Sequence, residues 1–529
     1  MKKQKNILLF LTILTFYKIY PNVSVDTSLI PSCWERDYLQ KRLTVEKNGI
    51  RNFINDQNIS DEDLPTIAFV CSGGGCRAMT STLGFLLGAQ QINLINATRY
   101  LSVLSGSTWT TAILLALGLN NIESLKEYLK DKMTRNIFDI YQVNNIDNVA
   151  KILLQKFSYN ENIQPSDFYG SVLISRLMEN FNGKEQNLTF RNIRNHLNKN
   201  KIFPFPIFTN VITNSGAQNY EWLEINPYTA GCDVLGGFIP TSYFESKFEN
   251  GNCIHSYPEE TLGSFMGLFG SAYSITIQDA EIHTDSEIID KTTNVLQQIE
   301  KQTGLNLTNQ RFLDAKINNF SYGIENSFFA DQEKLILVDA GMHFNLPFPP
   351  LLKMNRNIDI FLVCDASAGE ENQLAKAEEY AKQRNIPFPN LENCKKINDS
   401  IFIYEEKNAP TIIHFKNPIE MGTMDFSYSE EEFENICNSM ATMVVNTQNI
   451  ISQVIKNKIK NKTDESEWLN EIVYLQKYPE TGNRSGWIKK LLIDKPYNVA
   501  LGIIDSIYSL FRDANNINND EDFWDTIHI

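Results

Sequence analysis

Residues 66–79 read TIAFVCSGGGCRAM. The first part is an apolar run with the length of a buried strand, and apolar residues return at helical spacing after the three glycines. The segment therefore predicts a strand, a tight turn and a helix. Glycines at such a junction let the backbone approach a bound group closely, and the helix N-terminus offers N–H groups to it. The rest of the chain decides what the turn binds.

The alternation of strand and helix patterns continues through most of the chain. Further runs with the features of buried strands are YLSVL, FPIFTNVIT, KLILVD, DIFLVCD, IFIYE and TIIHF. Helical patterns cover Met79–Leu94, Thr108–Leu117, Ile122–Met133, Gln373–Gln383 and Glu430–Ile455. This order predicts an α/β fold, with a central mixed, largely buried β-sheet flanked by helices. Residues 235–330 interrupt the alternation with aromatic and Gly-rich segments, and we interpret them as an inserted cap or lid.

Two nucleotide-binding interpretations of the glycine turn are weak. Gly73, Gly75 and Ala78 satisfy the dinucleotide fingerprint G-x-G-x-x-A, which also needs a carboxylate about twenty residues further on. No Asp or Glu occurs between Pro65 and Ile122, and only Arg99 could serve an NADP variant. A phosphate-binding P-loop is excluded because no G-K-[ST] follows the glycines. No cofactor is expected.

Charge and cysteine spacing narrow the function classes. The 529 residues carry a formal net charge of −15, which argues against nucleic acid as a partner and against a polybasic contact with anionic membranes. The eight cysteines form no C-x-x-C pair, so no metal site is expected. Cys71 and Cys364 end apolar runs and should be buried thiols. In an oxidising compartment, Cys232 and Cys253 are the first candidates for a disulfide.

The N-terminus has the pattern of a secretory signal. Three lysines precede an eleven-residue apolar run in residues 1–20, which is short for a membrane span. We predict a signal peptide and hence a secreted or endomembrane-lumenal protein, with an uncleaved membrane anchor as the alternative. Sequons at Asn96, Asn187 and Asn306 would allow glycosylation there. Residues 21–64 form an N-terminal extension with one charged helical stretch.

A serine follows the second apolar run. In YLSVLSGSTW the run leads directly into Ser105, Gly106 and Ser107, and a helical pattern begins near Thr108. A serine at a tight strand-to-helix turn projects from the sheet edge, as in a nucleophile elbow. The neighbouring glycine turn would then offer N–H groups to a tetrahedral oxyanion. Arg77 would supply positive charge near an anionic part of the substrate.

The serine needs a base, and Asp339 is the best candidate. It ends the run KLILVD, so its carboxylate should lie at the edge of the sheet where the sites of α/β folds gather. None of the six histidines has the surroundings of a triad histidine, although His343 and His414 stay open. A Ser–Asp dyad is the simplest arrangement, and it requires the two groups to be close and shielded from water.

Three motifs resemble one enzyme family. SGGGCRAM, LSGSTW and VDAGMHFNLPFPPLL are similar to the motifs of the cytosolic phospholipase A2 and phospholipase B (lysophospholipase) family. Intermediate stretches such as EWLEINPYTAGCDVLGGFIPTSYF and FLVCDASAG match as well, so the resemblance covers most of residues 33–450. It implies a phospholipase A2/B-like catalytic domain over residues 65–529.

The resemblance implies roles for five residues. Ser105 would be the nucleophile and Asp339 its partner, Gly74 and Gly75 would form the oxyanion hole, and Arg77 would contact the substrate phosphate. The implied reaction is hydrolysis of fatty acyl esters of phospholipids or lysophospholipids at a membrane or micelle surface. About sixty residues precede the core, too few for the calcium-binding C2 domain of cytosolic members, so the resemblance implies calcium independence.

Two departures from the family pattern bear on function. Val103 stands where the family usually has glycine, two residues before the nucleophile, and Cys76 replaces an aromatic or similar residue. Val103 is the one feature that favours a catalytically weak or dead lipid-binding protein of the same fold. A patatin-like hydrolase would show a compact G-x-S-x-G and lack GSTW. The intact Ser105 and Asp339 favour the enzyme.

Overall fold

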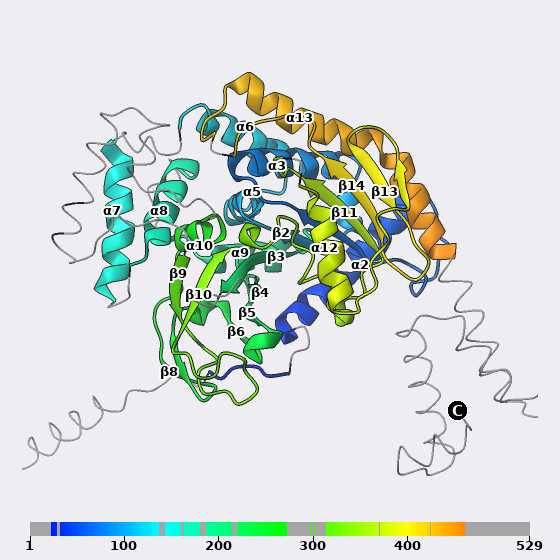
Figure 1. The fold of residues 1–529 in the computed structure, drawn as a ribbon. Coiled ribbons are helices and arrows are strands. Elements are labelled where there is room, and N and C mark those ends of the chain that lie inside the picture. Colours follow the sequence, from blue (N-terminus) through cyan, green and yellow to red (C-terminus); the bar gives the residue numbers. More distant parts are fainter. Residues whose placement is uncertain are drawn as a thin grey trace, which may run out of the picture. The chain divides into compact units, whose positions relative to one another are not determined.

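The computed structural model shows one mixed α/β unit (Figure 1). Apart from the isolated positions 297 and 301, it describes residues 23–28, 32–136, 143–159, 163–179, 187–213, 220–271, 314–369, 371–423 and 425–460. The predicted signal segment, residues 1–20, lies outside these ranges. No helix within them has both the length and the apolar composition needed to cross a membrane.

Within the described ranges the central sheet has twelve strands, of which five neighbours run parallel in the order β14-β11-β1-β2-β3. Their bounds are β1 Ile67–Cys71, β2 Tyr100–Val103, β3 Phe205–Thr213, β11 Ile360–Asp365 and β14 Thr411–Lys416. All five were predicted from their apolar runs, and nearly every side chain in them is buried. The α/β class with a mixed, largely buried sheet is confirmed.

Antiparallel strands complete the sheet. One edge is extended by β13 Ile401–Tyr404 and β12 Cys394–Lys396, and the other by β4 Tyr220–Ile225, β5 Thr229–Cys232 and β6 Gly237–Pro240. Strand β10 Lys334–Asp339 pairs with β3 and with β9 Asp314–Asn318, while β7 Lys247–Glu249 and β8 Asn252–His255 form a separate pair. Two strands of the segment 235–330, β6 and β9, therefore belong to the main sheet. A covering role for the rest of that segment stays a prediction.

Four helices pack together on one face of the sheet (Figure 1). They are α3 Gly75–Gln91, α5 Gly106–Ala116, α6 Ile122–Met133 and α13 Glu430–Asn446. Helix α12 Gln373–Gln383 connects β11 to β12, a parallel strand on the side of β11 away from β1. A right-handed crossover in that direction puts α12 on the other face. Further helices of the described residues include α2 Cys33–Ile54, α4 Leu94–Ala97, α7 Val143–Ser158, α8 Pro165–Leu177, α9 Phe190–Asn200 and α10 Leu262–Phe269.

Short 3-10 turns connect several of these elements. They are η2 Asp233–Leu235, η3 Thr241–Tyr243, η5 Ala340–Met342 and η6 Met354–Arg356. Helices α6 and α12 have the predicted bounds residue for residue. The predicted helix Met79–Leu94 begins four residues earlier, at Gly75, because the glycine turn leads directly into the first helical turn.

The N-terminal extension is part of the same core. Helix α2 starts after Ser32, whose side chain accepts a hydrogen bond from the Glu35 N–H (3.1 Å), as expected of an N-cap. Its buried Arg42 donates to the Ile95 carbonyl (2.8 Å), and Glu46 forms an ion pair with Arg99 (2.8 Å). The helix therefore holds the loop before β2 in place.

All eight cysteines are free thiols. The prediction of a Cys232–Cys253 disulfide is wrong. Cys232 ends β5 in the main sheet, whereas Cys253 lies in the separate pair β7–β8, so proximity in sequence did not bring them into bonding position. Cys71 and Cys364 are buried, as predicted, and lie opposite each other in neighbouring strands.

Candidate active site

Two strand-to-helix turns lie side by side at the C-terminal edge of the sheet. Strand β1 leads through the glycines into α3, and the adjacent β2 leads through Ser105 into α5. The two backbones touch, because a Cβ built on Gly106 would lie only 1.9 Å from the carbonyl oxygen of Gly75. Only glycine fits at position 106. The sequence-predicted serine turn and glycine turn therefore form one site.

Ser105 has a strained backbone. Its φ of 52° and ψ of −124° are rare for a residue with a side chain, and it lies directly before the first residue of α5. Such conformations cost about 1–3 kcal/mol and gather at functional sites, among them the nucleophile elbow. Val103 is a regular strand residue opposite Cys71 and Phe208. The β-branched residue is thus accommodated in the sheet, and its effect on activity stays a prediction.

The glycine turn uses conformations that favour glycine. Gly74 has φ 135° and Gly75 has φ 60°, and α3 begins at Gly75. The first N–H groups of a helix have no partner within the helix, so the start of α3 directs donors toward the turn. This geometry suits an oxyanion hole, the role predicted for these two residues.

Ser107, the second serine of LSGSTW, has a structural role. Ser107 is fully buried, and its hydroxyl donates to the Ser72 carbonyl and contacts the Thr82 hydroxyl (2.6 Å). Ser72 in turn accepts a hydrogen bond from the Ala366 N–H (2.7 Å). These bonds connect the serine turn to the glycine turn and to the end of β11.

Asp339 reaches the site through β3. Strand β2 ends with Val103 opposite Phe208, and β10 pairs with β3 further along, with Asp339 opposite Asn210. Strand β4 occupies the other edge of β3, so β2 and β10 share one edge and meet end to end. Because β10 is antiparallel to β3, its C-terminal end points toward the C-terminal end of β2. The topology therefore brings together the ends of the strands that precede Ser105 and carry Asp339.

The surroundings of Asp339 exclude water. Its side chain is fully buried, and one carboxylate oxygen accepts the Gly341 N–H (2.8 Å), while Ser105 is 3% exposed. A Cβ on Gly341 would lie 3.2 Å from that carboxylate oxygen and 3.4 Å from Oδ1 of Asn345. A Cβ on Gly73 would lie 2.9 Å from Cβ of Ser105 and 2.5 Å from the same Asn345 oxygen. The Asn345 amide therefore lies beside Gly73 of the glycine turn and close to Gly341, whose N–H binds Asp339.

Asn345 was not predicted as a site residue. It lies in VDAGMHFNLPFPPLL, one of the three motifs that carry the family resemblance. Its amide donates to the Gly73 carbonyl (3.0 Å) and to the Ser367 hydroxyl (2.7 Å). The signal available in the sequence was an amide residue six positions after the predicted catalytic aspartate.

The two histidines left open do not fit a triad. His414 on β14 hydrogen-bonds Asp365 (2.9 Å), and β14 lies three strand positions from β2, about 14 Å away. The Nδ1 atom of His343 accepts the Trp222 indole N–H (2.9 Å), so its other nitrogen carries the proton and has no lone pair for Ser105. Burial, with Arg384 and Lys376 nearby, lowers the pKa of His343 to about 4. It stays neutral at physiological pH.

Asp365 is a second buried carboxylate at a strand end. Burial acts to raise the pKa of Asp365, but the hydrogen bond and charge of His414, together with bonds from Ser367, outweigh it and lower the pKa. Asp365 is therefore ionised and engaged with His414. Its position on β11 separates it from Ser105 by β1.

Arg77 is buried beside the glycine turn. Its guanidinium donates to the carbonyls of Ala366 (2.7 Å) and Met421 and to the Thr423 hydroxyl (3.3 Å). A Cβ on Gly74 would lie 2.7 Å from one of its nitrogens. In this structure Arg77 braces the turn against the ends of β11 and β14, and its contact with a substrate phosphate stays a prediction.

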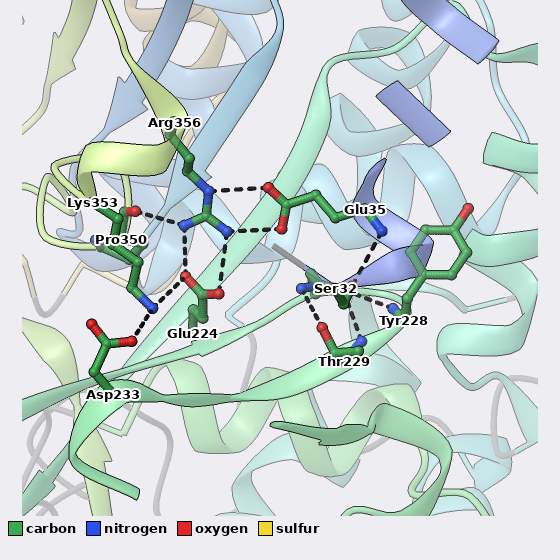
Figure 2. Close-up of polar contacts among 10 residues, drawn as sticks. Ser32, Glu35, Glu224, Tyr228, Thr229, Asp233, Pro350, Lys353 and Arg356 are labelled. Atoms are coloured by element: carbon green, nitrogen blue, oxygen red, sulfur yellow. Dashed lines mark hydrogen bonds and ion pairs between the residues drawn. The ribbon is translucent and has the colours of Figure 1, made fainter. Parts of the chain in front are cut away.

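The loop that carries Asp339 and Asn345, residues 339–356, ends in a buried ion cluster (Figure 2). Arg356 binds Glu35 of α2 (2.9 Å) and Glu224 of β4 (2.7 Å) and also donates to the Pro350 carbonyl (2.6 Å). Burial acts to lower the pKa of Arg356, but the two carboxylates outweigh it and raise the pKa. The cluster fixes the far end of this catalytic loop. Within the described ranges, no group of three or more His, Cys, Asp or Glu side chains could hold a metal ion.

Comparisons with known proteins agree with this arrangement. The sequence model of the lysophospholipase catalytic domain matches residues 67–399, which is more than half of the chain and includes both turns and Asp339. The chain is 24% identical to cytosolic phospholipase A2 epsilon of Homo sapiens over 546 aligned residues, which cover 83% of this chain and 61% of that protein. The chain thus spans less than two thirds of that relative.

A shorter relative is covered more completely. Cytosolic phospholipase A2 gamma of Homo sapiens is 24% identical over 488 aligned residues, covering 74% of this chain and 86% of that protein. Among solved structures, human GIVD cytosolic phospholipase A2 superimposes with a TM-score of 0.71 at 19% identity, covering 83% of this chain and 68% of the other. The structural likeness establishes a shared fold.

Proposed function

The chain belongs to the lysophospholipase catalytic domain family, and we propose that it hydrolyses fatty acyl esters of phospholipids or lysophospholipids. The observation that carries this proposal is the strained Ser105 at the meeting point of two turns, with Asp339 buried at the end of β10. A packed core gains nothing from a positive φ at a serine, so the strain has a functional explanation. Named relatives are phospholipases, which supports the substrate class.

The proposed mechanism has two halves. Asp339 takes the proton of the Ser105 hydroxyl as Oγ attacks the ester carbonyl, and the oxyanion forms against the N–H groups of Gly74 and Gly75. Collapse breaks the ester bond, and Asp339 returns the proton to the leaving alcohol. Water then attacks the acyl-serine as Asp339 accepts its proton, and the fatty acid is released when the acyl–Oγ bond breaks and Asp339 passes that proton to Oγ of Ser105.

The burial of the dyad supports this chemistry. A carboxylate is a weak base for a serine in water, and excluding water strengthens the electrostatic interactions within the site. Asp339 is fully buried and Ser105 nearly so. The proposed steps use only side chains and backbone groups, so we expect activity to persist without calcium.

Arg77 is proposed to contact the substrate phosphate. Its guanidinium lies against Gly74, within the turn that would bind the oxyanion, and it is the fixed positive charge nearest to that turn in the sequence. A phosphate would compete with the carbonyl partners of this side chain for its N–H donors.

The test is hydrolysis of lysophosphatidylcholine by the full-length protein in EGTA. We expect release of fatty acid and labelling of Ser105 by a fluorophosphonate. A protein that binds lysophosphatidylcholine micelles but releases no fatty acid, and that is not labelled, would be the lipid-binding alternative. A requirement for added calcium would contradict the calcium-independent mechanism.

Entry into the secretory pathway is part of the proposal. It rests on the pattern of residues 1–20 and on sequons such as Asn187, which is exposed. N-terminal sequencing of the protein from its native cells would show whether these residues are removed. Retention of Met1 on a protein that fractionates with membranes would favour the anchor.

A further inference from the structure

Asn345 joins the catalytic loop to the glycine turn by two hydrogen bonds of opposite direction. The Gly73 N–H donates to the main-chain carbonyl of Asn345 (3.2 Å), and the Asn345 side-chain amide donates to the Gly73 carbonyl (3.0 Å). Both the N–H and the carbonyl of Gly73 are thus bonded to Asn345. Two hydrogen bonds of ordinary length therefore restrict the separation between the loop and the turn.

The amide lies among the groups that would react. Its Oδ1 atom would be 2.5 Å from a Cβ on Gly73 and 3.4 Å from one on Gly341. The Cβ built on Gly73 would also lie 2.9 Å from Cβ of Ser105. The N–H of Gly341 donates to the carboxylate of Asp339. A shift of Asn345 would therefore move the glycine turn relative to the dyad.

A chain of polar contacts anchors the Asn345 amide. Beyond Gly73, it donates to the Ser367 hydroxyl (2.7 Å), and the Ser367 N–H donates to Asp365 (2.9 Å), whose other oxygen binds His414 (2.9 Å). Asp365 and His414 are 5% and 6% exposed. A connected polar chain in a low-dielectric interior is rigid and specific in its geometry.

We propose that Asn345 is a positioning residue that holds the oxyanion turn at its working distance from Ser105, and that the Ser367–Asp365–His414 chain keeps its amide in place. The proposal rests on the Ser105–Asp339 chemistry given above. Oxyanion stabilisation demands donors within about 2.7–3.1 Å of the developing charge, so a displacement of a few tenths of an ångström weakens catalysis without removing the site.

The main experiment replaces the amide without changing its size. Asn345→Asp removes the two N–H donors and turns an oxygen toward the Gly73 carbonyl, and Asn345→Ala removes the contact altogether. The matched control is Asn319→Asp. Asn319 is buried away from the two turns, and like Asn345 its amide donates two hydrogen bonds, here to the carbonyls of Phe329 (2.8 Å) and Gln332 (2.7 Å).

Three quantities are measured on the full-length protein: kcat and KM for lysophosphatidylcholine, the rate of Ser105 labelling by a fluorophosphonate, and Tm. We expect both Asn345 variants to lose about 10- to 100-fold in kcat and in labelling rate, with KM changed less than about threefold. The Asn319→Asp control should lower Tm to a similar degree and keep kcat and the labelling rate near those of the wild type.

A second experiment tests the anchoring chain. Asp365→Asn should lower kcat by about two- to tenfold, and in the double variant with Asn345→Ala it should cause no further loss, because Asp365 acts through Asn345. If Asp365 instead had a purely structural role, the fold losses of kcat in the two single variants would multiply in the double variant.

Several outcomes would overturn the proposal. They are wild-type labelling of Ser105 in both Asn345 variants, losses no larger than those of Asn319→Asp, or multiplying losses in the double variant. A wild-type protein that labels at Ser105 but releases no fatty acid would contradict the proposed function, and the labelling rates would still decide the role of Asn345. A wild-type protein that does not label at Ser105 overturns both.

Discussion

The glycine turn after β1 and the serine turn after β2 begin alike and differ in where the backbone is unusual. Both follow parallel strands that pair with each other, and both lead into helices on the same face of the sheet. In the first turn, the residues with positive φ are Gly74 and Gly75. In the second, the residue with positive φ is Ser105.

This difference separates a binding role from a reacting one. Glycine adopts positive φ at little cost, so the first turn presents its backbone and no side chain. A serine in that region costs stability, and the cost persists only where the hydroxyl must be held in one place. The two turns therefore suit an oxyanion and a nucleophile, respectively.

The largest effect is expected from Ser105→Ala. It should fold normally and lose at least about a thousandfold in esterase activity, as is typical when a serine nucleophile is removed. Fluorophosphonate labelling followed by peptide mapping checks the position. Labelling of Ser107 in the variant would show that the wrong serine of LSGSTW has been assigned.

Asp339→Asn should be about as inactive as Ser105→Ala, because an amide cannot accept the proton. His343→Ala and His414→Ala should each keep activity within about tenfold, or 1.4 kcal/mol of transition-state stabilisation. Comparison of kcat among the three variants is the measurement. A histidine variant as inactive as Ser105→Ala would replace the dyad with a triad.

The contact between the two turns can be broken by Gly106→Ala. The added Cβ would meet the Gly75 carbonyl oxygen at 1.9 Å, so the turns must separate, and we expect at least about a hundredfold loss of kcat. Gly118→Ala, at the other end of α5, is the control. Its φ of 69° makes the variant less stable, but kcat should be preserved. Equal kcat values in the two variants would mean that the separation of the turns is unimportant.

Arg77→Ala tests whether the guanidinium beside the glycine turn contacts the substrate phosphate. If the guanidinium binds the phosphate, kcat/KM for lysophosphatidylcholine should fall by roughly ten- to a hundredfold, and that for a neutral monoacylglycerol far less. Arg77→Lys should recover part of the loss. Equal losses on both esters would show that Arg77 only braces the turn through the Ala366 and Met421 carbonyls.

The smallest effect on catalysis is expected from Ser107→Ala. The substitution leaves the Ser72 carbonyl and the Thr82 hydroxyl short of a buried partner, which should lower the free energy of unfolding by about 1–3 kcal/mol. Activity should stay within about tenfold of the wild type. Denaturant unfolding and kcat, measured together, distinguish this structural serine from Ser105.

Local patterns were sufficient for the strands and helices nearest the site. The apolar runs of β1 and β2 and the helical spacing of α6 and α12 are properties of the segments themselves, so they could be predicted. Helices α8 and α10 were not predicted. They pack through glycines far apart in the sequence, since a Cβ on Gly170 would lie 2.0 Å from the Gly263 carbonyl oxygen.

The candidate site was predictable in its residues and not in its assembly. Ser105 and Asp339 were identified because each follows a recognisable strand within a recognisable motif. The approach of their two strand ends depends on β10 pairing with β3 beyond the point where β2 ends. No local sequence pattern encodes that pairing. The hydrogen bond from the Asn345 amide to Gly73 also depends on tertiary structure. The same is true of the separation of Cys232 from Cys253, which form no disulfide.

The cluster around Arg356 has a consequence for where the catalytic unit begins. The family match starts at residue 67, yet Glu35, one of the two carboxylates that neutralise this buried guanidinium, lies more than thirty residues earlier. Removing one partner of a buried ion pair typically costs about 3–5 kcal/mol. Trimming of the N-terminus past the Ser32 cap should therefore destabilise the fold. The folded catalytic unit therefore begins earlier in the chain than the family match does.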